Sequence, residues 1–553
     1  MKQLSTVAKR FMICHSFTKF QCFSMHIQPP FYTQKLSSLA DECFIVDSIC
    51  KTLHKNQKNW DNLTNNFSSV KFTNSIIKNT LLHLKQPINA KKALTFFHWS
   101  AQLNHFPHEV STYCITIHIL VKARYLKDAK VLLGSLLMRV SENEGKDSFF
   151  IVLDSIIDSY GDVESTPLVF DLFMQTCAKL RMIDCVLEAC KILDENGFML
   201  SVVTYNVMLY VIQKSDRCSL LWGVYEHMIE NRKRPNESTV KILVDGLCKE
   251  GRLQKFLDML DRILGKRCSS PLVIVNTCLV YGMIDDGRIE EGLVLLKRML
   301  QNHMILDVIG CSLVVLAKLK KGDLEAAWEV FEGMLKRGFD GNSFVYTLFI
   351  GAYCDQRMIE DAVEVLEEME NSGFKPFDET FDCLIQGCCR TQWLEDSLKY
   401  CERMMEMGLV PSRLAFNEMT NKLCENGYSK RVDEMLTVLL DKGFVPDSIT
   451  YSCLIAGYGK EGNVEDALKL YYEMEYKSIS PDAAAFNSLI VSLCHHKRLS
   501  EVEKFLMVMK DRQLRLDSFI YDIIISSYLD KRDKIRAQEL CREMVGVQVR
   551  ASN

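Results

Sequence analysis

The chain has 553 residues, of which 48% are hydrophobic and 25% are charged, and its formal net charge at pH 7 is −4. This composition is ordinary for a folded protein, and the 11 Pro and 26 Gly exclude extended disorder and a collagen-like chain. No stretch reaches the 18 or so apolar residues of a membrane span, the 22 Cys include no Cys-x-x-Cys pair, and the slightly acidic balance excludes binding of nucleic acid by bulk positive charge.

Residues 1–40 differ in composition from the rest of the chain. They contain five basic residues, and the first acidic residue is Asp41. Ser, Thr, Phe and Gln are common, and no continuous apolar core suits a secretory signal. We interpret the segment as an organelle transit peptide; a disordered basic tail is the alternative. One Arg and a moderate Ser content favour a mitochondrion over a plastid. Without this leader the formal charge is about −9.

An internal repeat dominates the remainder. Pro376, Pro411, Pro446 and Pro481 follow one another at intervals of 35 residues. This spacing divides residues 202–553 into ten tandem units, and every step is 35 residues except the 36 that follow Glu237. The units begin at Val202, Glu237, Val273, Val308, Ser343, Asp378, Arg413, Ser448, Ala483 and Ser518. Residues 110–201 are assigned two divergent repeats with an insertion, and residues 41–109 an N-terminal opening segment with a degenerate repeat.

The same residue types recur at fixed places in these units. The twenty-seventh position is Met in eight of ten units, the twelfth is often Cys, and the fifteenth is often Gly. Such a register indicates packing, with thiols and thioethers filling the seams between helices. In the Ser448 unit, apolar residues at helical spacing precede Gly462, and a second amphipathic stripe ends at Pro481.

Each unit is therefore predicted to be two helices joined by a turn. Neither helix can bury its apolar stripe alone, so neighbouring units must stack. The expected fold is all-α: an α-solenoid, a right-handed superhelix of about 12 helix-turn-helix repeats of 35 residues. No segment has a strand pattern.

The units resemble pentatricopeptide repeats, a family of RNA-binding solenoids from organelles. The matching stretches are Val203-Thr204-Tyr205-Asn206, residues 243–251 and Gly373-Phe374-Lys375-Pro376. Related protein-binding tetratricopeptide arrays have a period of 34 residues. Residues 92–126 are similar to the opening segment of plant members, and the uniform spacing resembles the P class.

The resemblance implies that two side chains in each unit, the fifth and the last, contact one RNA base. Most fifth residues here are Asn, Ser or Thr, as base contacts require; that these types merely favour helix starts is the alternative. The expected base-contacting residues are Asn206, Asn236, Thr277, Asp307, Ser312, Asn342, Thr347, Asn417, Asp447, Ser452, Asp482, Asn487 and Asp517. Carried over from the family, their pairs imply the sequence C-?-G-A-R-?-U-G-U, from the 5′ end.

Two further positions are expected to contact RNA. The second residues are mostly apolar, among them Val203, Ile274, Ile309, Phe344, Leu414, Ile449 and Phe519, and in the family they sandwich the base faces. The thirteenth positions include an intermittent cationic series that could follow the phosphates: Lys214, Lys249, Lys320, Arg390 and Lys460.

We expect no catalytic site, metal or cofactor. The Gly-rich, nucleophile-elbow and His-Glu-x-x-His motifs are missing from the sequence, as is the His-x-Glu and Cys-x-x-Cys signature of the deaminases found in editing members. The predicted function is sequence-specific binding of single-stranded organellar RNA in transcript stabilisation, processing, splicing or translation. Other RNA-processing or ribosomal proteins are further expected partners, and a membrane is not. The alternative is a scaffold or a mitoribosome-associated solenoid that binds proteins.

Overall fold

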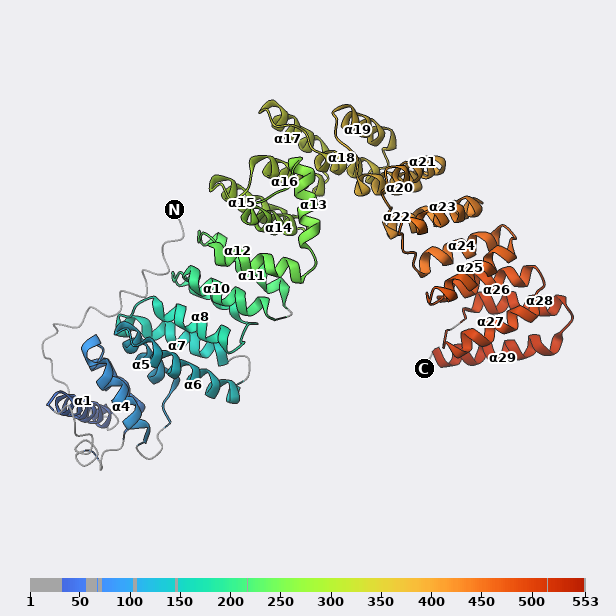
Figure 1. The fold of residues 1–553 in the computed structure, drawn as a ribbon. Coiled ribbons are helices and arrows are strands. Elements are labelled where there is room, and N and C mark those ends of the chain that lie inside the picture. Colours follow the sequence, from blue (N-terminus) through green and yellow to red (C-terminus); the bar gives the residue numbers. More distant parts are fainter. Residues whose placement is uncertain are drawn as a thin grey trace, which may run out of the picture. The chain divides into compact units, whose positions relative to one another are not determined.

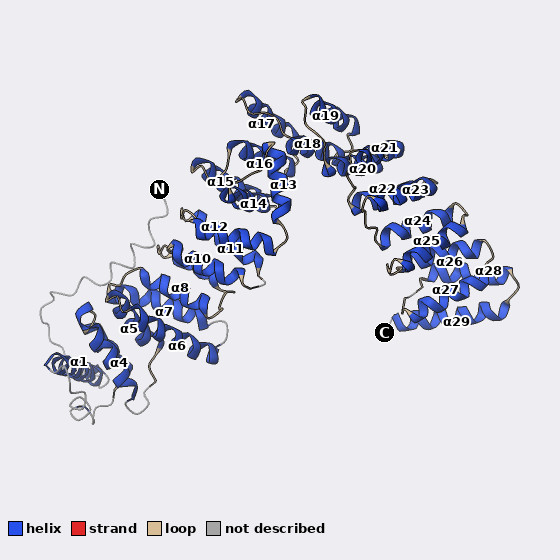
Figure 2. Cartoon of the chain, in the orientation of Figure 1, coloured by secondary structure: helices blue, strands red, loops and turns tan. Residues whose placement is uncertain are grey.

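The computed structural model describes residues 32–55, 67, 72–102, 107–144, 148–215, 217–514 and 516–551. These residues form 28 α-helices and one short 3-10 helix, without a strand (Figures 1 and 2), which confirms the predicted all-α class. The chain divides into two compact units, Met1–Arg234 and Pro235–Asn553. The predicted transit peptide, residues 1–40, lies outside the described residues except where helix α1 begins at Tyr32.

The first compact unit consists of helices packed in chain order. Its elements are α1 (Tyr32–Lys55), α3 (Asn74–His83), η1 (Pro87–Asn89), α4 (Ala90–Gln102), α5 (Val110–Lys122), α6 (Leu126–Glu144), α7 (Ser148–Val163), α8 (Leu168–Lys179), α9 (Val186–Glu195), α10 (Val202–Gln213) and α11 (Cys218–Glu230). Helix α7 lies between the pairs α5–α6 and α8–α9 in the chain, and it packs against α5.

The second compact unit contains nine helical hairpins within its described residues. They are formed by α12 (Glu237–Lys249) and α13 (Leu253–Leu264), α14 (Pro271–Asp285) and α15 (Ile289–Gln301), α16 (Asp307–Lys320) and α17 (Leu324–Lys336), α18 (Ser343–Asp355) and α19 (Ile359–Asn371), α20 (Asp378–Thr391) and α21 (Leu394–Glu406), α22 (Arg413–Glu425) and α23 (Ser429–Asp441), α24 (Ser448–Lys460) and α25 (Val464–Tyr476), α26 (Ala483–His495) and α27 (Leu499–Asp511), and α28 (Ser518–Asp530) and α29 (Lys534–Ala551).

Helix boundaries follow local sequence signals. In the α24–α25 hairpin, Asp447 caps the first helix and Gly462, at φ +78°, turns the chain in the left-handed region before Asn463 caps the second helix. The predicted start at Val273 is two residues late, because Pro271 occupies the first turn of α14, where its missing N–H costs nothing.

Stacking of first helices builds the core. Helices α18, α20, α22, α24, α26 and α28 each pack against the next in the series, which is the arrangement of a solenoid. The recurring Met residues lie in this core: Met299, Met369, Met404 and Met474 have no exposed surface. Their predicted packing role is confirmed.

Two of the recurring Cys residues pack against Gly in the next unit. A Cβ added at Gly387 would lie 2.7 Å from Sγ of Cys354, and one added at Gly457 would lie 2.6 Å from Cβ of Cys424. Cys354 and Cys424 are twelfth residues, and each glycine is the tenth residue of the following unit. Burial raises the pKa of both thiols and keeps them protonated. The described cysteines form no disulfide.

We predict that Gly457→Ala destabilises the protein by about 1–3 kcal/mol, because the new methyl group overpacks against Cys424 and Ser429. The control is Gly333→Ala in helix α17, where a Cβ meets no atom within 4 Å; it should stabilise by about 0.5–1 kcal/mol. Denaturant unfolding of both variants measures the difference, and equal effects would contradict this packing.

Candidate nucleic-acid interface

The last residue of most units is the N-cap of the next first helix. The side chains of Asn342, Ser412, Asp447 and Asp482 each accept a hydrogen bond from the backbone N–H three residues later, at 2.9–3.2 Å. Capping therefore belongs to the last residue of a unit. The fifth residues lie inside the helix, so the preference of Asn and Ser for helix starts does not account for them.

A second hydrogen bond joins the cap to the fifth side chain of its own unit, 30 residues earlier. Asn417 Nδ2 donates to both oxygens of Asp447, at 3.0 and 3.2 Å. Ser452 Oγ donates to Asp482 at 2.9 Å, and Asn342 Nδ2 donates to Ser312 Oγ at 3.2 Å. The structure thus brings together three of the predicted pairs, in helices α22–α24, α24–α26 and α16–α18.

Two further fifth residues follow a related pattern. The family pairing assigns no base to the unit of Asp382, and Asp171 was not among the expected base-contacting residues. Asp382 accepts from the backbone N–H of Ser412 at 3.0 Å, and Asp171 accepts from both the N–H and the hydroxyl of Ser201. The 35-residue lag from Val202 back to Pro167 marks Asp171 as a fifth residue, so the sequence contained the signal. Burial raises the pKa of Asp382, although the Ser412 hydrogen bonds oppose this.

Thr at the third position is a further polar contact, which the sequence analysis did not identify. Thr450 donates its hydroxyl to Asn417 Oδ1 at 2.6 Å, and Thr380 shares a hydrogen bond of 2.6 Å with Thr347. Both threonines lie 33 residues after their partners and are buried. Each threonine therefore fixes the orientation of the fifth side chain of the preceding unit.

For three other predicted pairs, the described residues show no hydrogen bond between the two side chains. Thr277 Oγ1 and Asn487 Oδ1 are buried without a hydrogen-bond partner, so neither contacts Asp307 or Asp517 through that atom. In the Thr277 unit, Asn276 instead donates to the carbonyl of Met304 at 2.9 Å. Thr347 contacts Thr380 and cannot hydrogen-bond with the Phe377 side chain. Asn206 and Asn236 belong to different compact units, and their pairing stays a prediction.

The second residues fall into two groups. Val203, Leu414, Ile449 and Phe519 are 63, 71, 52 and 65% exposed, which is unusual for apolar side chains at fixed places in a repeat. Ile274, Ile309 and Phe344 are 6, 0 and 6% exposed. The exposed side chains are available for stacking on bases, whereas the buried ones are covered by protein.

The cationic series is partly neutralised within the solenoid. Lys320 pairs with Asp285 at 2.9 Å and Arg390 pairs with Asp355 at 2.8 Å, each acid being the thirteenth residue of the preceding unit. Lys214 lies 5.6 Å from the centre of the Tyr210 ring, and Lys460 is exposed. Lys249 is the last residue of α12. Two of the five cations are therefore paired with acidic side chains.

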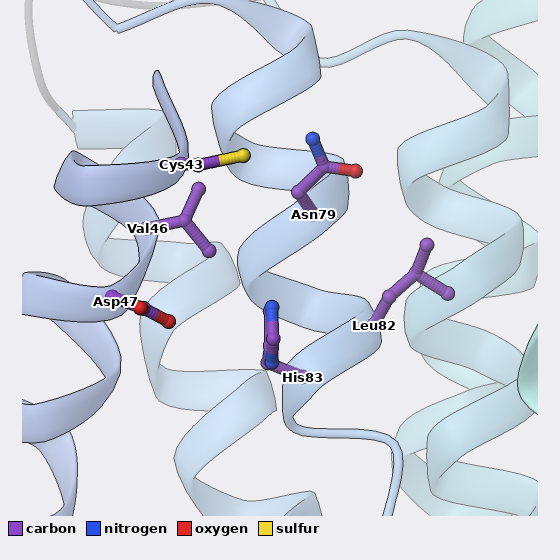
Figure 3. Close-up of a pocket in the computed structure, with 6 residues that line it drawn as sticks. All are labelled: Cys43, Val46, Asp47, Asn79, Leu82 and His83. Carbon is purple, nitrogen blue, oxygen red and sulfur yellow. The ribbon is translucent and has the colours of Figure 1, made fainter. Parts of the chain in front are cut away.

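A cleft in the first compact unit has no comparable polar register. Figure 3 shows its lining, which consists of Cys43, Val46, Asp47, Asn79, Leu82 and His83 from α1 and α3. In the described parts of the chain, no group of three or more His, Cys, Asp or Glu is placed to hold a metal ion. No described helix is long and apolar enough to cross a membrane.

The Asp447 carboxylate is stabilised as an anion. Burial alone would raise its pKa, but hydrogen bonds from the Thr450 N–H and the Asn417 amide outweigh this and hold the pKa below the ordinary value. A carboxyl with a lowered folded pKa contributes stability above its unfolded pKa of about 4 and loses it as the pH falls through the folded pKa.

We predict that Asp447→Asn lowers the free energy of unfolding by about 1 kcal/mol near pH 7, and that this difference shrinks as the pH falls below about 4. Asn still caps the helix, so the charge is the main change. Chemical denaturation at several pH values measures it, with the exposed Glu367→Gln as control. A difference that grows with acid would contradict the assigned role of the carboxylate.

Comparisons with known proteins agree with this register. A model of the PPR repeat family matches residues 200–249, 306–355, 341–390 and 446–495. A model of the PPR repeat matches residues 238–268, 379–409 and 484–514. Both sets of matches fall on the helical hairpins described above.

Curated relatives come from Arabidopsis thaliana. One mitochondrial pentatricopeptide repeat-containing protein is 45% identical over 222 residues, which are 40% of this chain and 40% of that relative. A second is 31% identical over 34% of this chain and 24% of its own length. A third, also named mitochondrial, is 27% identical over 41% of this chain and 34% of its own. The chain thus spans less than half the length of each.

Among solved structures, that of the pentatricopeptide repeat protein PPR10 from maize is similar at 14% identity and a TM-score of 0.41, covering 91% of this chain and 79% of that one. The repeat matches, the identity to the plant relatives and the stacked hairpins lead to one conclusion: the chain contains pentatricopeptide repeats.

Proposed function

We propose that the chain binds single-stranded RNA in a sequence-specific way and has no catalytic role of its own. The observation that carries the proposal is the arrangement around α22, α24 and α26. There, exposed apolar second residues alternate with hydrogen-bonded polar pairs at a 35-residue period. Apolar faces suit the stacking of unpaired bases, and the polar pairs suit hydrogen bonds to base edges.

The unit of Asn417 illustrates how one base would be bound. Leu414 and Ile449, the second residues of consecutive units, are both exposed and lie on the stacked helices α22 and α24. Between them in register lie Asn417 and Asp447, whose hydrogen bond fixes both polar groups before RNA arrives. A fixed pair loses little conformational entropy on binding, which favours affinity and base selectivity.

A scaffold that binds proteins is the second candidate. The pairing of Lys320 and Arg390 with acidic residues favours it, since an RNA-binding groove gains affinity from unpaired cations. The exposed second residues would then contact a protein partner instead of bases. The two candidates differ in one respect that can be measured, because only base contacts respond to a change of base identity.

We predict that Asn417→Thr changes the base preferred at one RNA position from U to G, by ten-fold or more in relative affinity. The Asn417–Asp447 pair resembles the family's uracil pair, and a Thr–Asp pair resembles its guanine pair. A good polar base contact contributes about 1–3 kcal/mol. Binding is measured at fixed salt concentration with two oligonucleotides that differ at that base alone.

The control is Asn421→Thr on the same helix, because Asn421 is exposed and contacts only Glu425 among the hydrogen bonds described. It should leave the base preference unchanged. If Asn417→Thr also leaves the preference unchanged, this unit does not select a base and the scaffold is favoured.

We further propose a mitochondrial location, with the plastid as the alternative. The acid-free basic leader supports it, as do two relatives that are named mitochondrial. The RNA bound would then be an organellar transcript, and the step served would be stabilisation, processing, splicing or translation.

Residues 1–40 fused to a fluorescent reporter should direct the reporter to mitochondria, because a basic, acid-free segment is typical of import signals. Microscopy with mitochondrial and plastid markers provides the measurement. The control replaces the five basic residues with Gln and should leave the reporter in the cytosol. A signal confined to plastids would contradict the proposed location.

A further inference from the structure

Helix α13 departs from the packing of the other second helices. Helices α23 and α25 pack against the first helix of their own unit and that of the next. Helix α13 contacts α12 and α14 in this way, but it also packs against α16 and α18, the first helices of the two units beyond (Figure 1). It therefore extends along the solenoid over several consecutive units.

Arg262 anchors the far end of α13. Its guanidinium pairs with Asp378 at 2.8 Å and with Glu379 at 3.4 Å, and it lies 3.7 Å from the centre of the Phe377 ring. Phe377 is the last residue of the Ser343 unit, and Glu379 is the second residue of the next. The anchor is thus formed at two positions that the family uses for bases.

The apolar face of α13 is buried over the same stretch. Phe256, Met259, Leu260 and Ile263 are at most 7% exposed, and the Phe256 ring lies 5.6 Å from the Tyr281 ring of α14. The residues Gln254, Lys255 and Asp258 of α13 are exposed. One side of the helix therefore faces the first helices of the solenoid and the other faces solvent.

The burial of second residues coincides with the reach of α13. Ile274, Ile309 and Phe344, which are buried, belong to α14, α16 and α18, and α13 packs against each of these three helices. In the later units, where α13 does not reach, Leu414, Ile449 and Phe519 are exposed. The fifth residues Thr277 and Ser312 also have no exposed surface.

We propose that α13 occupies the base-binding face of the units that begin at Val273, Val308 and Ser343, and so confines sequence selection within the second compact unit to residues 378–553. This inference rests on the proposed RNA binding. In this arrangement Thr277–Asp307 and Ser312–Asn342 select no base, whereas Asn417–Asp447, Ser452–Asp482 and Asn487–Asp517 remain available. The implied motif shortens to U-G-U.

The hydrophobic effect favours α13 over RNA on this face of the three units. Release of α13 would expose its four buried apolar residues together with Ile274, Ile309 and Phe344, and bases would have to cover the same area. Release would also separate Arg262 from two carboxylates. The helix therefore acts as an internal substitute for RNA across these three units.

Two reciprocal substitutions test the proposal, because the chain offers a matched pair of units. Ser312 and Ser452 are both fifth residues, and their hydrogen-bonded partners, Asn342 and Asp482, are both helix caps. Asn342→Asp and Asp482→Asn exchange the two cap types with little change in shape. The full chain and each variant select RNA from a randomised 20-nucleotide pool, and the enriched sequences are compared.

Asp482→Asn should move the preference at one position of the motif from G towards A by about ten-fold, while Asn342→Asp should leave every position unchanged. If both variants change the motif, or if Asn342→Asp alone changes it, then α13 does not cover these units. The proposed base selection would still be supported by that result. If neither changes it, base selection fails for the Ser452 unit, and the proposed function is contradicted.

The position of α13 can be measured without base selection. Arg262→Lys retains the positive charge and provides an amine opposite Asp378 and Glu379, which a carbodiimide joins without a spacer. Mass spectrometry should detect a crosslink between position 262 and position 378 or 379, with and without the RNA pool. Exposed Lys255 should give no crosslink to α20. A missing crosslink at position 262, or one lost on addition of RNA, would overturn the proposal.

Discussion

The solenoid depends on the hydrogen bonds at the start of most first helices. There the last polar residue of one unit caps the first helix of the next and, in several units, also bonds to the fifth side chain 30 residues earlier. One carboxylate or amide thus satisfies orphan backbone donors and fixes a side chain on the neighbouring helix. In the proposed function, the atoms of Asp447 that stabilise the helix start would therefore also serve base selection.

This double use restricts which residues can occupy the last position. Asn, Asp and Ser both cap a helix and hydrogen-bond with a neighbour, and they predominate there. Phe377 has no polar group to do either, and at that junction the Thr347 and Thr380 hydroxyls bond to each other. Arg262 covers its ring, so α13 is anchored at a unit that lacks a polar cap.

Charge contributes little to the proposed interface. Acidic thirteenth residues neutralise some of the cations, and the chain is acidic overall, with a formal net charge of −4. RNA affinity would then come mainly from stacking on exposed apolar side chains and from preformed polar pairs, which are less sensitive to salt than phosphate contacts. The units with exposed Leu414, Ile449 and Phe519 have this surface, and the units under α13 lack it.

The sequence by itself determined the period, the helical hairpins, most of the buried Met and Cys residues and three hydrogen-bonded polar pairs. These features are encoded within one turn or one repeat, by apolar spacing, capping residues and glycine turns such as Gly462. The Thr450 hydroxyl escaped prediction because its role depends on a partner in the preceding unit.

The position of α13 was decided by the tertiary structure alone. Its apolar stripe shows that one face must be buried, but an amphipathic pattern does not specify which surface covers it. The contact between Arg262 and Asp378 joins residues 116 positions apart and exists only when the intervening hairpins are stacked. For the same reason the sequence assigned Ile274 and Leu414 one role, and only packing between distant helices separated them into a covered residue and an exposed one.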